Sequence, residues 1–199
     1  DEPNVLANFL RLDTANAEGM VFPDTYFFTR NTSDISLLKR ANQKLTSVLT
    51  KAWGSRAEEL PLNNAYEALI LASVIEKESG LNSERRKISG VFLRRMELGM
   101  RLQSDPTVIY GMGSKYQGNI SREDLLESTP YNTYRIDGLP PTPISLAGEA
   151  SIKASLNPTA SSFLYFVSRG DGSHYFSENL DEHNEAVGRF RRTNDLKSK

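Results

Sequence analysis

The sequence predicts an α+β fold: a helical core, extended aromatic-rich segments and a C-terminal β-hairpin. Two observations carry this prediction. Apolar residues recur at helical spacing in several long segments, and two short aromatic segments near the C-terminal end flank a turn. The chain has 199 residues, 38% of them hydrophobic, which is enough to bury a core. It contains no repeat, low-complexity tract or long linker, so one domain over residues 1–199 is expected.

The N-terminal part is predicted to contain two helices joined by extended chain. Residues 3–13 are typical of a short helix, and residues 20–29 are rich in aromatic side chains, which favours extended chain. Ser33 or Asp34 can cap a helix that runs to about Trp53, because its apolar residues form one stripe.

Two more helices are predicted in the middle of the chain. The first starts at Asn64, which is followed three positions later by a glutamate in a capping-box-like arrangement, and runs to about Ser79. The second runs from about Ser83 to Leu98 and ends at Gly99. Its basic residues are expected mostly on solvated faces. They are Arg85, Arg86, Lys87, Arg94 and Arg95.

The C-terminal part is predicted to contain loops, a hairpin and a final helix. Residues 103–143 have the composition of loops held on a scaffold, and such loops often carry binding residues. Residues 163–167 and 174–177 flank a turn with two glycines, which predicts a β-hairpin followed by a helix from about Asn179. Aromatic side chains in such a hairpin are more typical of sheet core than of a carbohydrate platform.

Charge and composition exclude several classes of function. Lys and Arg number 24 and Asp and Glu 25, so no net field draws the chain to nucleic acid. The sequence has no cysteine, which excludes disulfides and thiolate metal sites, and it has no phosphate-binding loop or ligand cluster that would indicate a cofactor. No apolar run reaches the roughly 20 residues that span a bilayer. We therefore expect neither metal nor cofactor, and any membrane anchor outside this chain.

Glu78 lies on the apolar face of the helix that is predicted to end near Ser79. At about 100° per residue, Val74 and Ile75 project within about 60° of Glu78, whereas Glu76 projects about 160° away. Partial burial would raise the pKa of the Glu78 carboxyl and favour the protonated form, which a general acid requires. Glu76 is expected to be an ordinary solvated glutamate. Position alone favours a simpler interpretation of Glu78, an end-of-helix carboxylate that reaches solvent.

Four motifs change this interpretation. They are ASVIEKES at residues 72–79, GMRLQSDPTVIYG at 99–111, YNTY at 131–134 and GLPP at 138–141. In this order and spacing they resemble the YceG-like family of endolytic murein transglycosylases, over a stretch from about Glu18 to about Val187. Several motifs in register are far more specific than a lone Glu-Ser pair. The resemblance makes Glu78, the second glutamate of the first motif, the catalytic residue.

The resemblance implies an enzyme that cleaves peptidoglycan without hydrolysis. Protonated Glu78 would donate to the oxygen that leaves C1 of N-acetylmuramic acid and then, as a base, take the proton of that sugar's C6 hydroxyl, which closes a 1,6-anhydro ring. One carboxylate is then enough, whereas ordinary glycosidases need two. Two alternatives remain: a non-catalytic peptidoglycan-binding or scaffold module, and a muramidase hydrolase that uses Asp105 or another acid as second carboxylate.

The candidate substrate-binding residues combine rings that can stack on sugars with amide, hydroxyl and carboxyl groups that can orient them. They are Gln103, Ser104, Asp105, Tyr131, Asn132, Thr133 and Tyr134. Asp105 is equally well explained as a helix start, with Pro106 in the first turn. His174 could face the cleft, but it has no evident carboxylate or serine partner, so a packed or surface histidine is favoured.

The resemblance also implies a location and partners. Family members are typically anchored in the bacterial inner membrane, with the catalytic domain on the periplasmic side, and carry a membrane segment and a LysM-like region ahead of this portion. Both are expected to be absent from this chain. Peptidoglycan strands are the expected substrate and peptidoglycan synthases the candidate protein partners, with nascent strand length as the property that cleavage sets.

Overall fold

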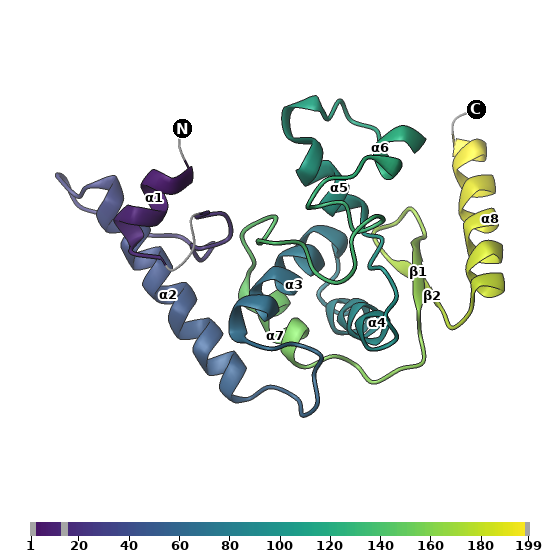
Figure 1. Ribbon diagram of the computed structural model, residues 1–199, viewed down its shortest axis with the longest axis horizontal. Helices are drawn as coiled ribbons and strands as arrows, with labels where there is room; N and C mark the ends of the chain where they lie inside the picture. Colours follow the sequence, from purple (N-terminus) through teal and green to yellow (C-terminus); the bar gives the residue numbers. More distant parts are fainter. Residues whose placement is uncertain (1–2, 13–15, 198–199) are drawn as a thin grey trace.

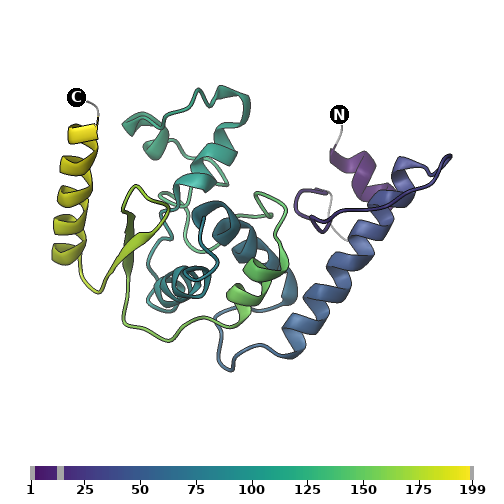
Figure 2. The same cartoon turned by 180° about the vertical axis from the view of Figure 1, so that it is seen from behind.

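The computed structural model describes residues 3–12 and 16–197. Its elements, in chain order, are α1 (Pro3–Leu10), α2 (Asp34–Gly54), α3 (Ala65–Glu78), α4 (Arg85–Glu97), α5 (Asp105–Met112), the 3-10 helix η1 (Gly113–Lys115), α6 (Arg122–Leu126), α7 (Glu149–Leu156), β1 (Tyr165–Ser168), β2 (His174–Ser177) and α8 (Leu180–Lys197). These helices and the strand pair confirm the predicted α+β class. Figures 1 and 2 show α1 and α2 at one end of the molecule, α8 at the other, and α3, α4 and α7 between them.

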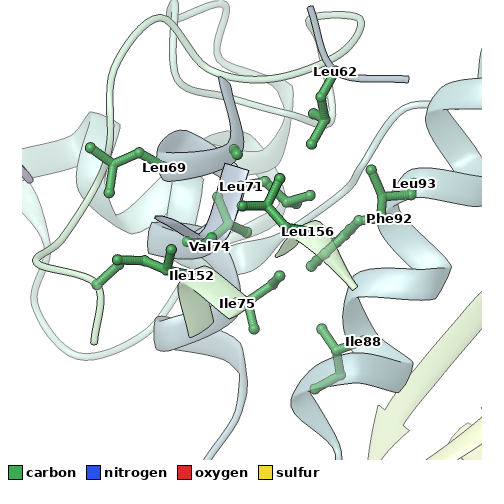
Figure 3. Packing of buried hydrophobic residues seen from close by; sticks show 14 of the residues in the cluster. Leu62, Leu69, Leu71, Val74, Ile75, Ile88, Phe92, Leu93, Ile152 and Leu156 are labelled. Carbon is green, nitrogen blue, oxygen red and sulfur yellow. The ribbon is translucent and has the colours of Figure 1, made fainter. Parts of the chain in front are cut away.

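Helix α3 is the centre of the hydrophobic core. Every residue from 68 to 75 is buried, so this helix is covered on all sides rather than along one stripe. Leu71 and Ile75 belong to the same buried cluster as Phe92 of α4 and Leu156 of α7, and Figure 3 shows these side chains converging. This packing holds the backbone of α3 in place, including its last residue, Glu78.

The predicted helix starts are confirmed in their main features. Ser33, rather than Asp34, caps α2, because its hydroxyl accepts from the Ser36 N–H at 3.2 Å. Asn64 caps α3 by accepting from the Glu67 N–H at 3.0 Å. The predicted helix over residues 3–13 ends at Leu10, and residue 13 lies outside the described residues.

The extended segment at residues 20–29 forms no strand in the described structure. Phe22 is buried, and its backbone N–H donates to the Ala41 carbonyl of α2 at 3.1 Å. Phe27 and Phe28 project into solvent. The aromatic residues therefore do not share one face: one anchors the segment to α2, and the others remain outside the core.

Three helices differ from the expectation: α5 and α6 lie where loops had been expected, and α7 lies where no element had been predicted. α5 and α6 both fall within residues 103–143, and α5 starts at Asp105 with Pro106 in its first turn, as one of the two interpretations of Asp105 required. α7 packs against α3 with Ile152 and Leu156 buried. Its other buried positions are alanine and serine, too small and polar to produce a recognisable apolar stripe.

The predicted hairpin is confirmed. β1 and β2 pair antiparallel, with Phe166 opposite Phe176 and Ser168 opposite His174. The turn contains Gly170 and Gly172, both with positive φ, which other residues adopt only with strain. Phe166 meets Phe92 of α4 edge to face, with ring centroids 5.7 Å apart, so the inner face of the hairpin packs on α4.

Two of the five basic residues of α4 depart from the solvated positions expected for them. Arg95 is 7% exposed, and Arg85 is half-buried against Glu76, whereas Arg86, Lys87 and Arg94 are exposed. Residues 85 and 95 face α7 and the hairpin, two elements that the helical period of α4 alone does not reveal. Within the described ranges, no helix is both long and apolar enough to cross a membrane.

Candidate active site

A cleft of about 470 Å³ lies between the C-terminal end of α3 and the hairpin. Glu78, Gln103, Asp105 and Tyr134 line it from one side. Residues of β1, His174 of β2 and Leu180, His183 and Phe190 of α8 line it from the other. Four of the eight candidate site residues therefore meet in one cavity, although they come from three different parts of the chain.

The Glu78 carboxyl is half-buried at the base of this cleft. Burial raises its pKa from the ordinary value of 4.5 to about 7, because the charged form loses hydration. A hydrogen bond from Ser104 opposes this rise, and the negative charge of Asp105 adds to it. A carboxyl with this pKa is present in both protonated and ionised forms near neutral pH, as an acid/base group must be.

Ser104 holds the Glu78 carboxyl in place. Its hydroxyl donates to Glu78 Oε1 at 2.6 Å, and Ser104 itself is buried. The Ser104 N–H donates to Thr133 Oγ1 at 2.9 Å, and its carbonyl accepts from the Thr107 hydroxyl at 2.6 Å. Among the described residues, Glu78 Oε2 has no hydrogen-bond partner. Oε1 is thus anchored, and Oε2 is left for a ligand.

Asp105 and Tyr134 form a second polar pair in the cleft. The Tyr134 hydroxyl donates to Asp105 Oδ1 at 2.6 Å. Burial raises the pKa of Tyr134 far above its ordinary value of 10, and the bond to Asp105 raises it further. Tyr134 is therefore a neutral hydroxyl whose direction Asp105 sets. Asp105 also begins α5, which confirms the helix-start interpretation, and it lines the cleft as well.

Gln103 presents its amide to the cleft from a strained backbone position. Its φ is 53°, in the left-handed region that glutamine rarely adopts, and its N–H donates to the Thr133 carbonyl at 3.1 Å. Its side-chain Oε1 accepts from Arg95 Nη1 at 3.3 Å. Because arginine can only donate, this bond identifies the oxygen and leaves the NH₂ group as the donor available to a ligand.

Arg95 links the two sides of the cleft, and sequence reasoning missed it. Its Nη1 donates to the carbonyl oxygens of Arg101 and Leu102, at 3.1 and 2.9 Å, on the side of Gln103. Its Nε donates to the Leu164 carbonyl at 2.7 Å, next to the hairpin, and its guanidinium lies 5.0 Å from the Tyr165 ring centre. Its position in a basic run gave no signal of this role.

Three candidate substrate-binding residues do not offer polar groups to the cleft. Asn132 and Thr133 are 1% and 0% exposed, and the Asn132 NH₂ group donates to backbone carbonyls around the end of α6. The Tyr131 ring packs on Tyr110, and its hydroxyl bonds Thr142 at 2.8 Å. The expectation of sugar contact is not supported for these residues, because their polar atoms are already used in holding the loop.

His174 is packed, as expected, but it does have a carboxylate partner. Its Nδ1 lies 2.8 Å from Glu84 Oε2, and its backbone N–H donates to Glu84 Oε1 at 3.3 Å. Glu84 precedes α4 and is 90 positions away in sequence. Nothing in the local sequence could connect the two residues, yet their contact holds His174 at the cleft that it lines.

The expectation for Glu76 was wrong. Its Oε2 accepts from Arg85 at 2.7 Å and from the Gly148 N–H at 3.0 Å. Burial acts to raise the pKa of Glu76, but hydrogen bonds from Arg85, Ser151 and Gly148 outweigh it, so the pKa lies below its ordinary value. Glu76 joins α3 to α4 and to the start of α7, which covers a helix face that periodicity assigned to solvent.

The fold and the site together define a class: an α+β domain whose cleft holds a carboxyl with a raised pKa, suited to acid/base chemistry. Among the described residues, no group of histidine and carboxylate side chains is arranged to hold a metal ion. The chain belongs to the YceG-like family, whose model matches residues 3–189.

Similar proteins agree with this assignment. The chain is 35% identical over 173 residues to the endolytic murein transglycosylase of Bacillus subtilis (strain 168), covering 87% of this chain and 48% of that protein. It is 32% identical over 176 residues to the endolytic murein transglycosylase of Streptococcus pneumoniae serotype 2 (strain D39), covering 85% of this chain and 31% of that protein. The chain thus spans about half or less of the length of these relatives.

A solved structure also resembles the fold. It is that of a putative yceG-like protein from Listeria monocytogenes, with a TM-score of 0.74 and 34% sequence identity. The match covers 93% of this chain and 64% of that one. The arrangement of helices and hairpin described above is therefore shared over nearly the whole chain.

Proposed function

We propose that this chain cleaves peptidoglycan glycan strands internally by transglycosylation, with Glu78 as its acid/base residue. The observation that carries the proposal is the Glu78 carboxyl, with a pKa of about 7 and a free Oε2 in the cleft. The names of the two relatives support the choice of substrate, because each is an endolytic murein transglycosylase.

The reaction needs only one carboxyl. Protonated Glu78 gives its proton to the glycosidic oxygen between N-acetylmuramic acid C1 and the next N-acetylglucosamine, and the C1–O bond breaks. The C6 hydroxyl of the same muramic acid then bonds to C1 and returns its proton to Glu78. The products are a free 4-hydroxyl on one fragment and a 1,6-anhydro ring on the other. No water is consumed, and Glu78 ends in its starting form.

The geometry of the cleft suits these two proton transfers. Ser104 fixes Oε1, so Oε2 can act on both the leaving oxygen and the C6 hydroxyl without a change of rotamer. The attacking hydroxyl belongs to the substrate, so ring closure has the advantage of an intramolecular reaction. The Gln103 NH₂ group and the Asp105–Tyr134 pair are the groups that we assign to binding and orienting the sugars.

The setting of this activity is part of the same proposal. Peptidoglycan lies outside the cytoplasm, so the domain would act there, on the periplasmic side of the inner membrane, with an anchor outside these residues. Cleavage of nascent strands would limit their length, and peptidoglycan synthases, which make those strands, are the partners that this role requires.

Mass spectrometry of digested peptidoglycan tests the proposal. Purified peptidoglycan is incubated with the domain, with Glu78→Gln and with Asp105→Asn. We expect wild type to release fragments with 1,6-anhydro ends, one water lighter than reducing ends, and Glu78→Gln to release none.

Two other results would reject the proposal in different ways. Reducing ends that disappear in Asp105→Asn would indicate a two-carboxylate hydrolase, since Asp105 lines the same cleft. Glycan that stays intact while both wild type and Glu78→Gln sediment with it would indicate a binding module. A negative result is repeated with a longer form of the protein before it is accepted.

A further inference from the structure

We propose that His174 binds substrate in this cleft, that Glu84 positions it, and that its ligand is a sugar hydroxyl. This inference rests on the proposed function for the nature of the ligand. It adds a contact on the hairpin side of the cleft, opposite Glu78, Gln103 and the Asp105–Tyr134 pair.

The His174 ring is held in one orientation. The Glu84 carboxylate accepts two hydrogen bonds from His174, one from the ring Nδ1–H at 2.8 Å and one from the backbone N–H at 3.3 Å. The rings of Phe166 and Phe176 meet the imidazole edge to face, with centroids 5.4 and 6.3 Å away. The side chains of His174 and Glu84 are only 10% and 14% exposed. A surface histidine without function does not require this degree of fixation.

The bond to Glu84 determines which ring nitrogen faces the ligand. A carboxylate oxygen accepts, so Nδ1 carries a ring hydrogen, and in the neutral form of the ring Nε2 is the nitrogen with the lone pair. Nε2 has no hydrogen-bond partner among the described residues, and it is not one of their buried, unsatisfied polar atoms. It therefore reaches the solvent-filled cleft that His174 lines. An exposed lone pair of this kind accepts from a hydroxyl.

The surroundings favour a sugar over a charged ligand. Glu78 and Asp105 make the opposite side of the cleft acidic, and Arg95 directs its Nε and Nη1 to carbonyl oxygens and to Gln103 rather than into the cleft. Aromatic and apolar side chains make up much of the rest, including Tyr165, Phe166 and Leu180. Neutral hydroxyl donors and apolar sugar faces fit this lining.

Two substitutions separate substrate binding from a purely structural role. In His174→Asn the amide lies where Nδ1 was, so the bond to Glu84 is kept and the group at Nε2 is lost. In His174→Gln the amide reaches the position of Nε2, and the bond to Glu84 is lost. We expect His174→Asn to lower the unfolding temperature less than His174→Gln does, but to raise KM for glycan cleavage about tenfold, the effect of one lost hydrogen bond to a ligand.

His174→Gln should be the less stable and the more active of the two variants. Its unfolding temperature should lie below that of His174→Asn, and its cleavage rate should lie above that of His174→Asn. If His174 served only to fasten the hairpin to α4, His174→Asn would have wild-type kinetics and His174→Gln would be the impaired variant. That outcome would overturn the proposal.

Nuclear magnetic resonance of the ring nitrogens tests binding without turnover. The chain has only two histidines, so ¹⁵N-labelled rings give two assignable sets of signals. A soluble peptidoglycan-derived tetrasaccharide is added to the Glu78→Gln variant, and the His174 Nε2 signal is followed. We expect the unliganded ring to be protonated on Nδ1 and Nε2 to shift on binding.

An Nε2 signal that does not move at saturating tetrasaccharide, or a tetrasaccharide that does not bind at all, refutes the inference. Failure of the proposed function would give a different result from failure of the His174 contact. If wild type does not cleave peptidoglycan but the Nε2 signal shifts, the transglycosylase assignment fails and the His174 contact stands.

Discussion

Replacing Glu78 by glutamine should stabilise the protein above neutral pH. Burial raises the pKa of this carboxyl from 4.5 to about 7, so the folded state binds its proton more tightly than the unfolded state does. At about 1.4 kcal/mol per pH unit, holding the ionised carboxyl in the folded protein costs about 3 kcal/mol at alkaline pH. Glutamine has no charge to bury, and its amide oxygen can still accept from Ser104.

The sign of the effect depends on pH. Below about 4.5, Glu78 is protonated in both states and contributes no pH dependence. Between about 4.5 and 7 the folded state binds more protons than the unfolded state, so the stability of wild type falls as pH rises. Above about 7 the loss is complete. Glu78→Gln lacks this loss, and the difference between the two proteins should grow from near zero to about 3 kcal/mol across this window.

Urea denaturation followed by helical circular dichroism at pH 4.5, 6 and 8.5 measures this difference. At pH 8.5 the midpoint of the variant should be higher by about 1 M. Glu76→Gln on the same helix is the control with the opposite sign, because the pKa of Glu76 is lowered and its loss leaves Arg85 without its carboxylate. Equal stability of wild type and Glu78→Gln at pH 8.5 would refute the reasoning about burial.

Two further predictions concern the rate and the packing. The kcat/KM for glycan cleavage should fall about tenfold per pH unit above about 7, because Glu78 loses its acidic proton. Ser104→Ala removes a hydrogen bond that lowers the Glu78 pKa, so the fall in kcat/KM should begin at higher pH and the maximal rate should be lower. A pH profile of Ser104→Ala that matches wild type in steady-state assays would contradict this role of Ser104. Gly90→Ala should destabilise the protein by about 1–3 kcal/mol in urea denaturation, because the added Cβ would lie 2.6 Å from the Thr159 carbonyl oxygen. Gly54→Ala is the matched control, because its Cβ would meet nothing within 4 Å. Alanine should stabilise the end of α2 by up to about 1 kcal/mol. Equal losses of stability at both sites would show that the close contact with Thr159 is not the cause of the loss at Gly90.

The parts of the fold that depend on local sequence could be predicted. Capping by Ser33 and Asn64 located the starts of α2 and α3, a periodic apolar stripe located the rest of α2, and the glycines of the turn located the hairpin. α7 could not be predicted, since its packing against α3 relies on alanine and serine at close approach rather than on large apolar residues. For the same reason the face of α3 that carries Glu76 was assigned to solvent.

The candidate site could be predicted only in part. Helical period placed Glu78 with the apolar stripe, and the motifs marked the loop of Gln103 and Asp105 as its neighbours. A motif groups residues by sequence, however, and its side chains need not face the same way. Of the YNTY segment, only Tyr134 lines the cleft. The His174–Glu84 pair depends on a contact across 90 residues, which a single sequence does not encode locally.

Arg95 has a consequence for the shape of the cleft. Its guanidinium spans the distance from the loop of Gln103 to Leu164, and so fixes the aperture of the cleft. Lysine, with one compact ammonium group, cannot reproduce these directed bonds to both sides. A change at position 95 would alter which polymers can enter while leaving Glu78 untouched. The width of the opening and the acidity of the Glu78 carboxyl are thus set by different residues.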